Sequence, residues 1–141
     1  GYKISHDSSV VAVIPDIASI NNGNLLGENF QEQAKIIGIP NFERKYNENL
    51  IEFLRSVPNV VFDTHFNVQN LKADWGHATP EIALDVCAKA GVKRLFMFHH
   101  APEDDDHEVA IKQTHAQTIA VLHNIEVINA CEEDQWPLTA A

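Results

Sequence analysis

The sequence predicts an α/β fold in which short buried strands alternate with helices. Three compact apolar runs, Val10–Ile14, Asn59–Asp63 and Val92–Phe98, have the length and β-branched or aromatic content of buried strands. Helical patterns separate them, and this alternation is typical of layered α/β architectures. With 141 residues, 45% of them hydrophobic, the chain can bury a proper core. We therefore expect residues 1–141 to form a single domain.

The first third combines a hairpin with loop-like sequence. Tyr2–Ser5 is expected to pair with Val10–Ile14 across a turn at Asp7-Ser8-Ser9. Residues 17–27 are rich in asparagine and glycine, which is typical of a loop. Gln31–Ile37 is predicted to form a short helix.

Helix boundaries are easier to predict further along the chain. Glu48–Val57 has one apolar face and is followed by Pro58, which ends it. Thr79 is a suitable N-cap and Pro80 suits the first helical position. The helix that they begin is expected to close at Gly91, because glycine is common just past a helix C-terminus.

The last third is predicted to hold one long helix and two further strands. The helix begins at Asp105 or Asp106, where negative charge complements the helix dipole, and runs to about His123. Ile125–Ala130 follows as a strand, and Trp136–Thr139 is expected to form a short last one.

Composition excludes several classes of protein. A net charge of −10 argues against a nucleic-acid-binding module, since phosphate contacts need clustered Lys and Arg. It does not exclude an enzyme that cleaves phosphoesters, because bound cations would reverse the local field. Cys87 and Cys131 lack CxxC spacing, which suggests reduced packing residues and a cytoplasmic protein and leaves a single disulfide open. No membrane span or signal peptide is evident.

Three predicted strands end in groups that can bind metal or transfer protons: Asp16, Asp63 and His99. Ligands usually bind at this rim of α/β sheets. Asp16 follows Pro15 and could bridge two cations or act as a base, or it could cap a turn. Asp63 could orient the imidazole of His77 for proton transfer, although His77 could equally pack at the start of a helix.

The other histidines are weaker candidates. His99 and His100 are adjacent, so an extended strand points them to opposite faces, and we expect His99 to reach the site. His107, His115 and His123 recur every eight residues, which drifts by about 80° per step on a helix of 3.6 residues per turn. They do not form one metal-binding face. His65, beside Asp63, could line the same rim, and the acidic run Glu103–Asp106 is expected to be a solvated loop and helix start.

Several short motifs occur in an order that resembles a known family. They are Val10-Val-Ala-Val-Ile-Pro-Asp16, Val60-Val-Phe-Asp-Thr-His-Phe66, Trp75-Gly-His-Ala-Thr79 and Arg94-Leu-Phe-Met-Phe-His-His-Ala-Pro102. In this order they resemble the C-terminal half of a metallo-β-lactamase-fold hydrolase of the ribonuclease Z-like or phosphodiesterase-like branch. The resemblance implies half of an αβ/βα sandwich, with a mixed sheet and helices packed on one face.

The resemblance also implies a role for each candidate residue. Asp16 matches the aspartate that bridges two metal ions, and His99 matches the last histidine ligand. His77 matches the proton donor of a Gly-His-Ser-Thr motif, with Ala78 in place of serine. Asp63 matches the acidic partner of that histidine. Two divalent metal ions are implied, zinc or else manganese or iron.

One departure from the family pattern is large. The family's His-x-His-x-Asp-His motif, which supplies most of its ligands, does not occur in this sequence. Two protein ligands cannot complete a catalytic two-metal site, so we expect the isolated chain to be inactive. The missing N-terminal half or a partner chain would complete it, and a homo-oligomer is expected.

These observations favour a metal-dependent hydrolase acting on a small-molecule or phosphoester substrate. Two alternatives remain open. The chain could be a non-catalytic interaction or regulatory module that retains the fold, or a di-iron redox protein with overlapping ligand types.

Overall fold

A computed structural model describes residues 1–15, 48–67, 70 and 77–140. Within these ranges the chain forms a five-stranded sheet and several helices. Their bounds are β1 (Tyr2–His6), β2 (Ser9–Ile14), α2 (Glu48–Leu54), β3 (Asn59–Asp63), α3 (Pro80–Ala90), β4 (Arg94–Phe98), α4 (Asp106–Ala120), the 3-10 helix η2 (Val121–His123) and β5 (Glu126–Asn129).

The strands lie in the sheet in the order in which they occur in the sequence, β1-β2-β3-β4-β5. β1 and β2 form an antiparallel hairpin, whereas β2, β3, β4 and β5 are parallel. Parallel neighbours require crossover connections, and α3 and α4 supply those from β3 to β4 and from β4 to β5. The predicted α/β class with a mixed sheet is confirmed.

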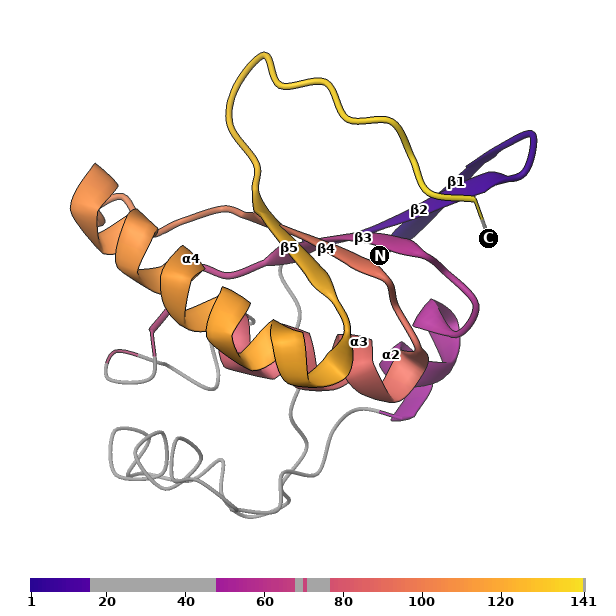
Figure 1. The fold of residues 1–141 in the computed structure, drawn as a ribbon, viewed down its shortest axis with the longest axis horizontal. Coiled ribbons are helices and arrows are strands. Elements are labelled where there is room, and N and C mark those ends of the chain that lie inside the picture. Colours follow the sequence, from indigo (N-terminus) through magenta and orange to yellow (C-terminus); the bar gives the residue numbers. More distant parts are fainter. Residues whose placement is uncertain (16–47, 68–69, 71–76, 141) are drawn as a thin grey trace.

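The core lies between the sheet and the helices, which cover one face of it (Figure 1). Alternate strand residues point to this face, and its central members are fully buried: Ala12, Ile14, Val60, Phe62, Leu95 and Met97. The opposite face is also apolar but less well covered. On this face Val13, Val61 and Phe96 are neighbours across the paired strands. Phe96 packs edge-to-face on Trp136.

Local sequence signals determine the bounds of α3. Thr79 has an extended backbone and its hydroxyl accepts a hydrogen bond from the backbone N–H of Ile82, which satisfies one of the helix's unpaired donors. Gly91 ends the helix with a φ of 77°, a left-handed conformation that suits glycine. Both predicted caps are confirmed.

Two of the predicted elements differ from the structure. α2 ends at Leu54, three residues before the predicted Val57, because Ser56 turns the backbone into the left-handed region with a φ of 64°. Trp136–Thr139 does not form a strand; a single bridge joins Ser9 to Ala140 there. Asp16, the loop at 17–27 and the predicted helix Gln31–Ile37 lie outside the described residues.

The two cysteines have different environments. Cys87 is fully buried in α3, as expected for a packing residue, whereas Cys131 is exposed after β5. The prediction that both are packing residues is therefore wrong for Cys131. Both thiols are free. None of the helices in the described ranges is both long and apolar enough to cross a membrane.

Candidate functional site

The parallel strands bring Asp63 and His99 together at one edge of the sheet. Asp63 is the last residue of β3 and lies in register with Phe98, so His99 follows immediately beside it. His77 reaches the same place from the segment that leads into α3. His77 and His99, which are 14 and 36 positions from Asp63 in the sequence, are thus its neighbours in space.

Asp63 is the centre of this site. Its side chain is fully buried, and one carboxylate oxygen, Oδ2, lies 2.6 Å from Nδ1 of His77 and 3.0 Å from Nδ1 of His99. The other oxygen, Oδ1, accepts a hydrogen bond from the backbone N–H of His65 at 3.0 Å. A carboxylate that accepts from both rings fixes the tautomer in which each Nδ1 carries the proton.

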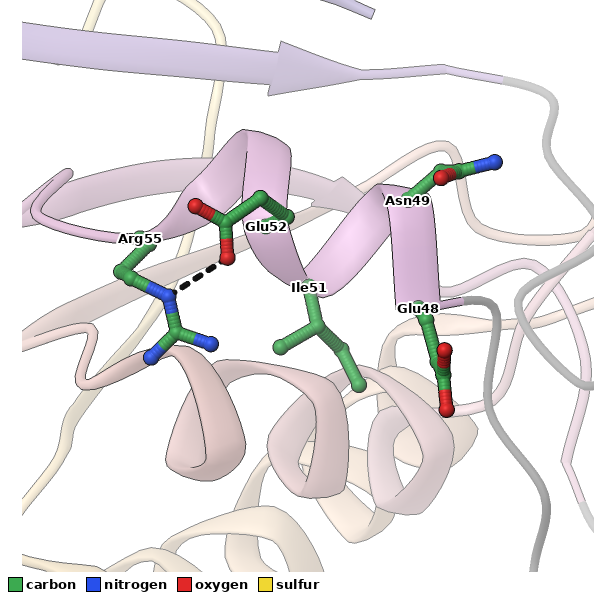
Figure 2. Close-up of a pocket in the computed structure, with 5 residues that line it drawn as sticks. All are labelled: Glu48, Asn49, Ile51, Glu52 and Arg55. Atoms are coloured by element: carbon green, nitrogen blue, oxygen red, sulfur yellow. Dashed lines mark hydrogen bonds and ion pairs between the residues drawn. The ribbon is translucent and has the colours of Figure 1, made fainter.

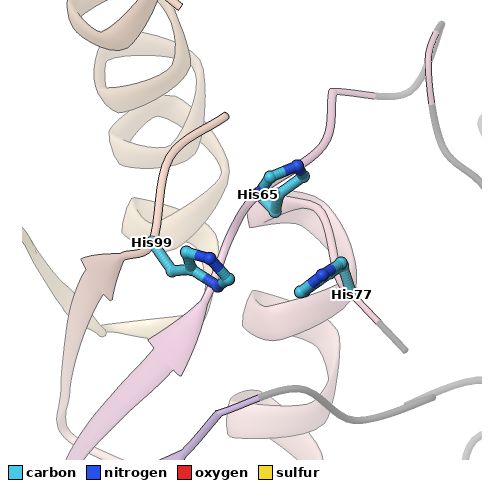
Figure 3. A group of neighbouring side chains, drawn as sticks. All are labelled: His65, His77 and His99. Atoms are coloured by element: carbon cyan, nitrogen blue, oxygen red, sulfur yellow. The ribbon is translucent and has the colours of Figure 1, made fainter. Parts of the chain in front are cut away.

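His65 joins the two predicted histidines. Its ring stacks on His77, with centroids 4.5 Å apart, and its centroid lies 5.1 Å from that of His99. Figure 3 shows the three rings pointing toward one another. One ligand nitrogen from each lies within 4.8 Å of those of the other two. His65 was expected only to line the same rim as Asp63, and its position two residues beyond the end of β3 was the signal for that.

The surroundings of His65 lower the pKa of its imidazole. Burial lowers the pKa of its imidazole, the nearby His77 and His99 rings lower it further, and Asp63 opposes the shift. Its Nδ1 is buried and has no hydrogen-bond partner among the described residues. A neutral imidazole with an unshared lone pair is the form that binds metal ions.

His99 adopts an unusual backbone conformation, with a φ of 60°. For a residue with a Cβ atom the left-handed region costs roughly 1–2 kcal/mol. Such outliers cluster at functional sites, where surrounding contacts hold them. The bond from the His99 ring to Asp63 is one such contact.

His100 bonds to a different strand and not to Asp63, although both histidines follow the end of β4. Its Nε2 lies 2.6 Å from Oδ1 of Asn129, on β5. Burial lowers the pKa of its imidazole, and the bond to Asn129 opposes that shift. Among the other histidines, His115 is exposed and pairs with Glu81 on α3.

A buried ion pair supports the segment that carries His65. The side chains of Lys112 and Asp104 are only 6% and 5% exposed, and Nζ of Lys112 donates to Oδ2 of Asp104. The same ammonium group donates to the backbone carbonyl of His65 at 2.8 Å. The expectation that the whole acidic run is solvated is wrong for Asp104, because a cation from α4 pairs with it.

A separate hollow with a volume of about 450 Å³ lies on α2. Figure 2 shows its lining residues Glu48, Asn49, Ile51, Glu52 and Arg55. Arg55 and Glu52 pair with each other at 2.7 Å. The lining of this hollow contains no histidine or cysteine, the ligands that transition metals such as zinc favour.

Comparison with known proteins identifies the fold. The metallo-β-lactamase fold protein YhfI from Bacillus subtilis superposes with a TM-score of 0.59 and 16% identity, over 91% of this chain and 39% of that protein. The chain therefore has the fold of part of a metallo-β-lactamase-fold protein, as the motifs predicted.

A curated relative narrows the resemblance. Ribonuclease Z of Picrophilus torridus is 31% identical over 65 residues, which are 45% of this chain and 21% of that protein. Over these 65 residues the chain is similar to a ribonuclease Z, and over most of its length it has the fold of the metallo-β-lactamase-fold protein. The chain spans about a fifth of this ribonuclease Z. No protein-family model matches the chain.

The metallo-β-lactamase fold implies divalent metal ions, and the three imidazoles gathered at this edge are ligands of a suitable type for one. Imidazole is a common ligand of zinc, iron and nickel. An ion with metal–nitrogen bonds of about 2.0–2.1 Å in tetrahedral geometry would hold ring centroids roughly 5 Å apart. The observed centroid separations are 4.5, 5.0 and 5.1 Å.

Proposed function

We propose that this chain forms one half of a metal-dependent hydrolase that cleaves a phosphoester. The observation that carries the proposal is the pairing of Asp63 with both His77 and His99 at one sheet edge. A shared carboxylate holds both rings in one orientation, and a positioned imidazole is the commonest group for proton transfer. The ribonuclease Z likeness favours a phosphoester over other substrates.

Each residue has a separate task in this proposal. His99 and Asp16 would hold the metal ions, which would supply Lewis acidity and the activation of a water molecule. His77 donates a proton to the leaving-group oxygen through Nε2. Asp63 keeps Nδ1 of His77 protonated and stabilises the ring when it carries two protons.

We further propose that the open face of the sheet receives the other half of the fold, supplied by an N-terminal segment or by a partner chain. This face continues onto the hairpin, where Tyr2 and Ile4 lie in register with Val13 and Val11. Tyr2 is 68% exposed and Ile4 is 58% exposed. Large apolar side chains gathered on one face favour an interaction surface.

The test uses protein in which both halves of the fold are present. With bis(p-nitrophenyl) phosphate as substrate, His77→Ala should lower kcat by about 10²–10⁴-fold while metal content stays unchanged, because only proton transfer is removed. Asp16→Ala and His99→Ala should lose metal and turnover together. His123→Ala, at an exposed position on η2, is the control and should change neither quantity.

Any of three results would contradict the proposal. Full turnover in His77→Ala would remove the proton-donor role, and full metal content in both ligand variants would remove the metal assignment. Bound iron with redox activity and no hydrolysis would replace the hydrolase with a redox protein.

A further inference from the structure

We propose that His65, His77 and His99 together bind one transition-metal ion in this chain alone, with Asp63 holding the rings from behind. The inference rests on the metal-binding part of the proposed function and not on its substrate. It adds His65 as a ligand, and it predicts that the 141-residue chain binds metal without a second half.

The hydrogen bonds of Asp63 direct suitable atoms toward the ion. Because Nδ1 of His77 and Nδ1 of His99 both bond to Oδ2 of Asp63, Nε2 is the ring nitrogen that each can offer to a metal. A carboxylate behind a metal-binding imidazole is a recurrent arrangement that fixes the ring and raises its basicity. Here one buried carboxylate serves two rings at once.

His65 completes the set. Its backbone N–H bonds to the same Asp63 side chain, and the buried ammonium of Lys112 holds its carbonyl. The backbone of His65 is thus fixed from two sides, whereas its ring nitrogen Nδ1 is buried without a hydrogen-bond partner in the described part of the chain. Metal binding would satisfy that atom, whereas a buried polar atom left without a partner destabilises the fold.

The site needs a small rearrangement to close. One nitrogen of each ring lies within 4.8 Å of one nitrogen of each of the other two, whereas tetrahedral bonds of about 2.0–2.1 Å would place three ligand nitrogens roughly 3.4 Å apart. The His65 ring must also turn from its stack on His77, where the planes differ by 20°. Since Nδ1 of His65 has no partner to lose, this rotation breaks no hydrogen bond of that atom.

The role of His77 differs between this inference and the proposed function. A ligand at Nε2 cannot at the same time donate a proton from that atom. In the isolated chain we assign Nε2 of His77 to the metal, and in the completed hydrolase we assign it to the leaving group. The two assignments predict different consequences of removing His77, so they can be tested separately.

The experiment titrates Co²⁺ into the purified 141-residue chain and follows its visible absorption, which is strong for four- or five-coordinate sites and weak for six-coordinate ones. We expect one equivalent of Co²⁺ to bind with an intense spectrum. His65→Ala, His77→Ala and His99→Ala should each weaken Co²⁺ binding by at least about 10-fold. Losing a residue that only supports a metal ligand already lowers metal affinity by about 10–100-fold, and losing a ligand itself should cost no less. His123→Ala should bind as the parent chain does.

Two further variants separate ligation from packing. His65→Phe keeps an aromatic ring against His77 but has no nitrogen, so it should bind Co²⁺ as poorly as His65→Ala. Asp63→Asn keeps all three ligands but removes the charge behind them, and its affinity should fall by about 10–100-fold. Urea unfolding of each variant without metal shows that it is folded.

Parent-like Co²⁺ affinity in His65→Phe would overturn the assignment of His65, as would failure of the folded parent chain to bind one equivalent. Parent-like binding by His77→Ala, with turnover lost in the completed protein, would overturn the three-ligand site and leave the proposed function standing. Metal binding that depends on all three histidines, with no phosphodiester cleavage in the completed protein, would support the three-ligand site and overturn the proposed hydrolase function.

Discussion

Replacing Lys112 with methionine tests the buried ion pair behind His65. The substitution keeps an unbranched side chain of similar length and removes the ammonium group. The Asp104 side chain, 5% exposed, is left as an uncompensated charge, and the carbonyl of His65 loses a donor at 2.8 Å. Breaking a buried pair by removing one partner costs about 3–5 kcal/mol. This is a large part of the roughly 5–15 kcal/mol that stabilises a typical domain.

The chain provides a matched control for this measurement. Arg55 and Glu52 form an ion pair in which the side chains are 55% and 71% exposed, and such pairs contribute about 0.2–1 kcal/mol. Urea unfolding followed by circular dichroism gives the free energy of unfolding for Lys112→Met and Arg55→Met by linear extrapolation. We expect the first loss to be several times the second.

A double variant identifies the cause of the loss. Lys112→Met with Asp104→Leu leaves no buried charge, so much of the lost stability should return. If Lys112→Met costs no more than Arg55→Met, the ammonium group does not compensate a buried carboxylate and the reasoning is refuted. The same conclusion follows if the double variant is less stable than the single one.

Three further predictions follow from backbone conformation and burial. Gly91→Ala should cost about 1 kcal/mol in urea unfolding, because the left-handed φ of 77° penalises a Cβ atom that meets nothing within 4 Å; an unchanged midpoint would contradict this. Burial raises the pKa of the Cys87 thiol. A thiol-specific disulfide reagent should therefore modify Cys131 at once and Cys87 only on unfolding. Rapid modification of two thiols per folded chain would contradict this. His99→Gly should be more stable than His99→Ala, since both lose the imidazole and only alanine keeps the penalty of a φ of 60°; the reverse order would show that the backbone there is unstrained.

Sequence patterns predicted the elements whose limits are determined locally. The Thr79 hydroxyl and the left-handed Gly91 act within one turn of α3, so their residue types alone indicate where the helix begins and ends. Strands β3 and β4 were predicted from short apolar runs with the length and composition of buried strands. The pairing of Asp63 with His77 was also anticipated, because both belong to motifs with a recognisable order.

Other features depend on contacts between distant segments, which no local pattern shows. Asp104 lies in an acidic run that reads as solvated, yet Lys112 lies on the face of α4 that packs toward it. The ring of His65 meets His77 only because the two segments converge. Thr139 belongs to an apolar stretch that resembles a strand, but its backbone pairs with the side chain of Asn59 and not with a neighbouring strand.

That side chain of Asn59 offers a probe of motion. Its amide donates to the carbonyls of Val10 and Thr139, and its oxygen accepts from the N–H of Thr139. The residue is fully buried, so its two amide protons are held by different segments of the chain. Hydrogen exchange at one proton reports opening of the contact with β2, and exchange at the other reports release of the segment around Thr139. A single side chain can therefore measure two local stabilities in the same experiment.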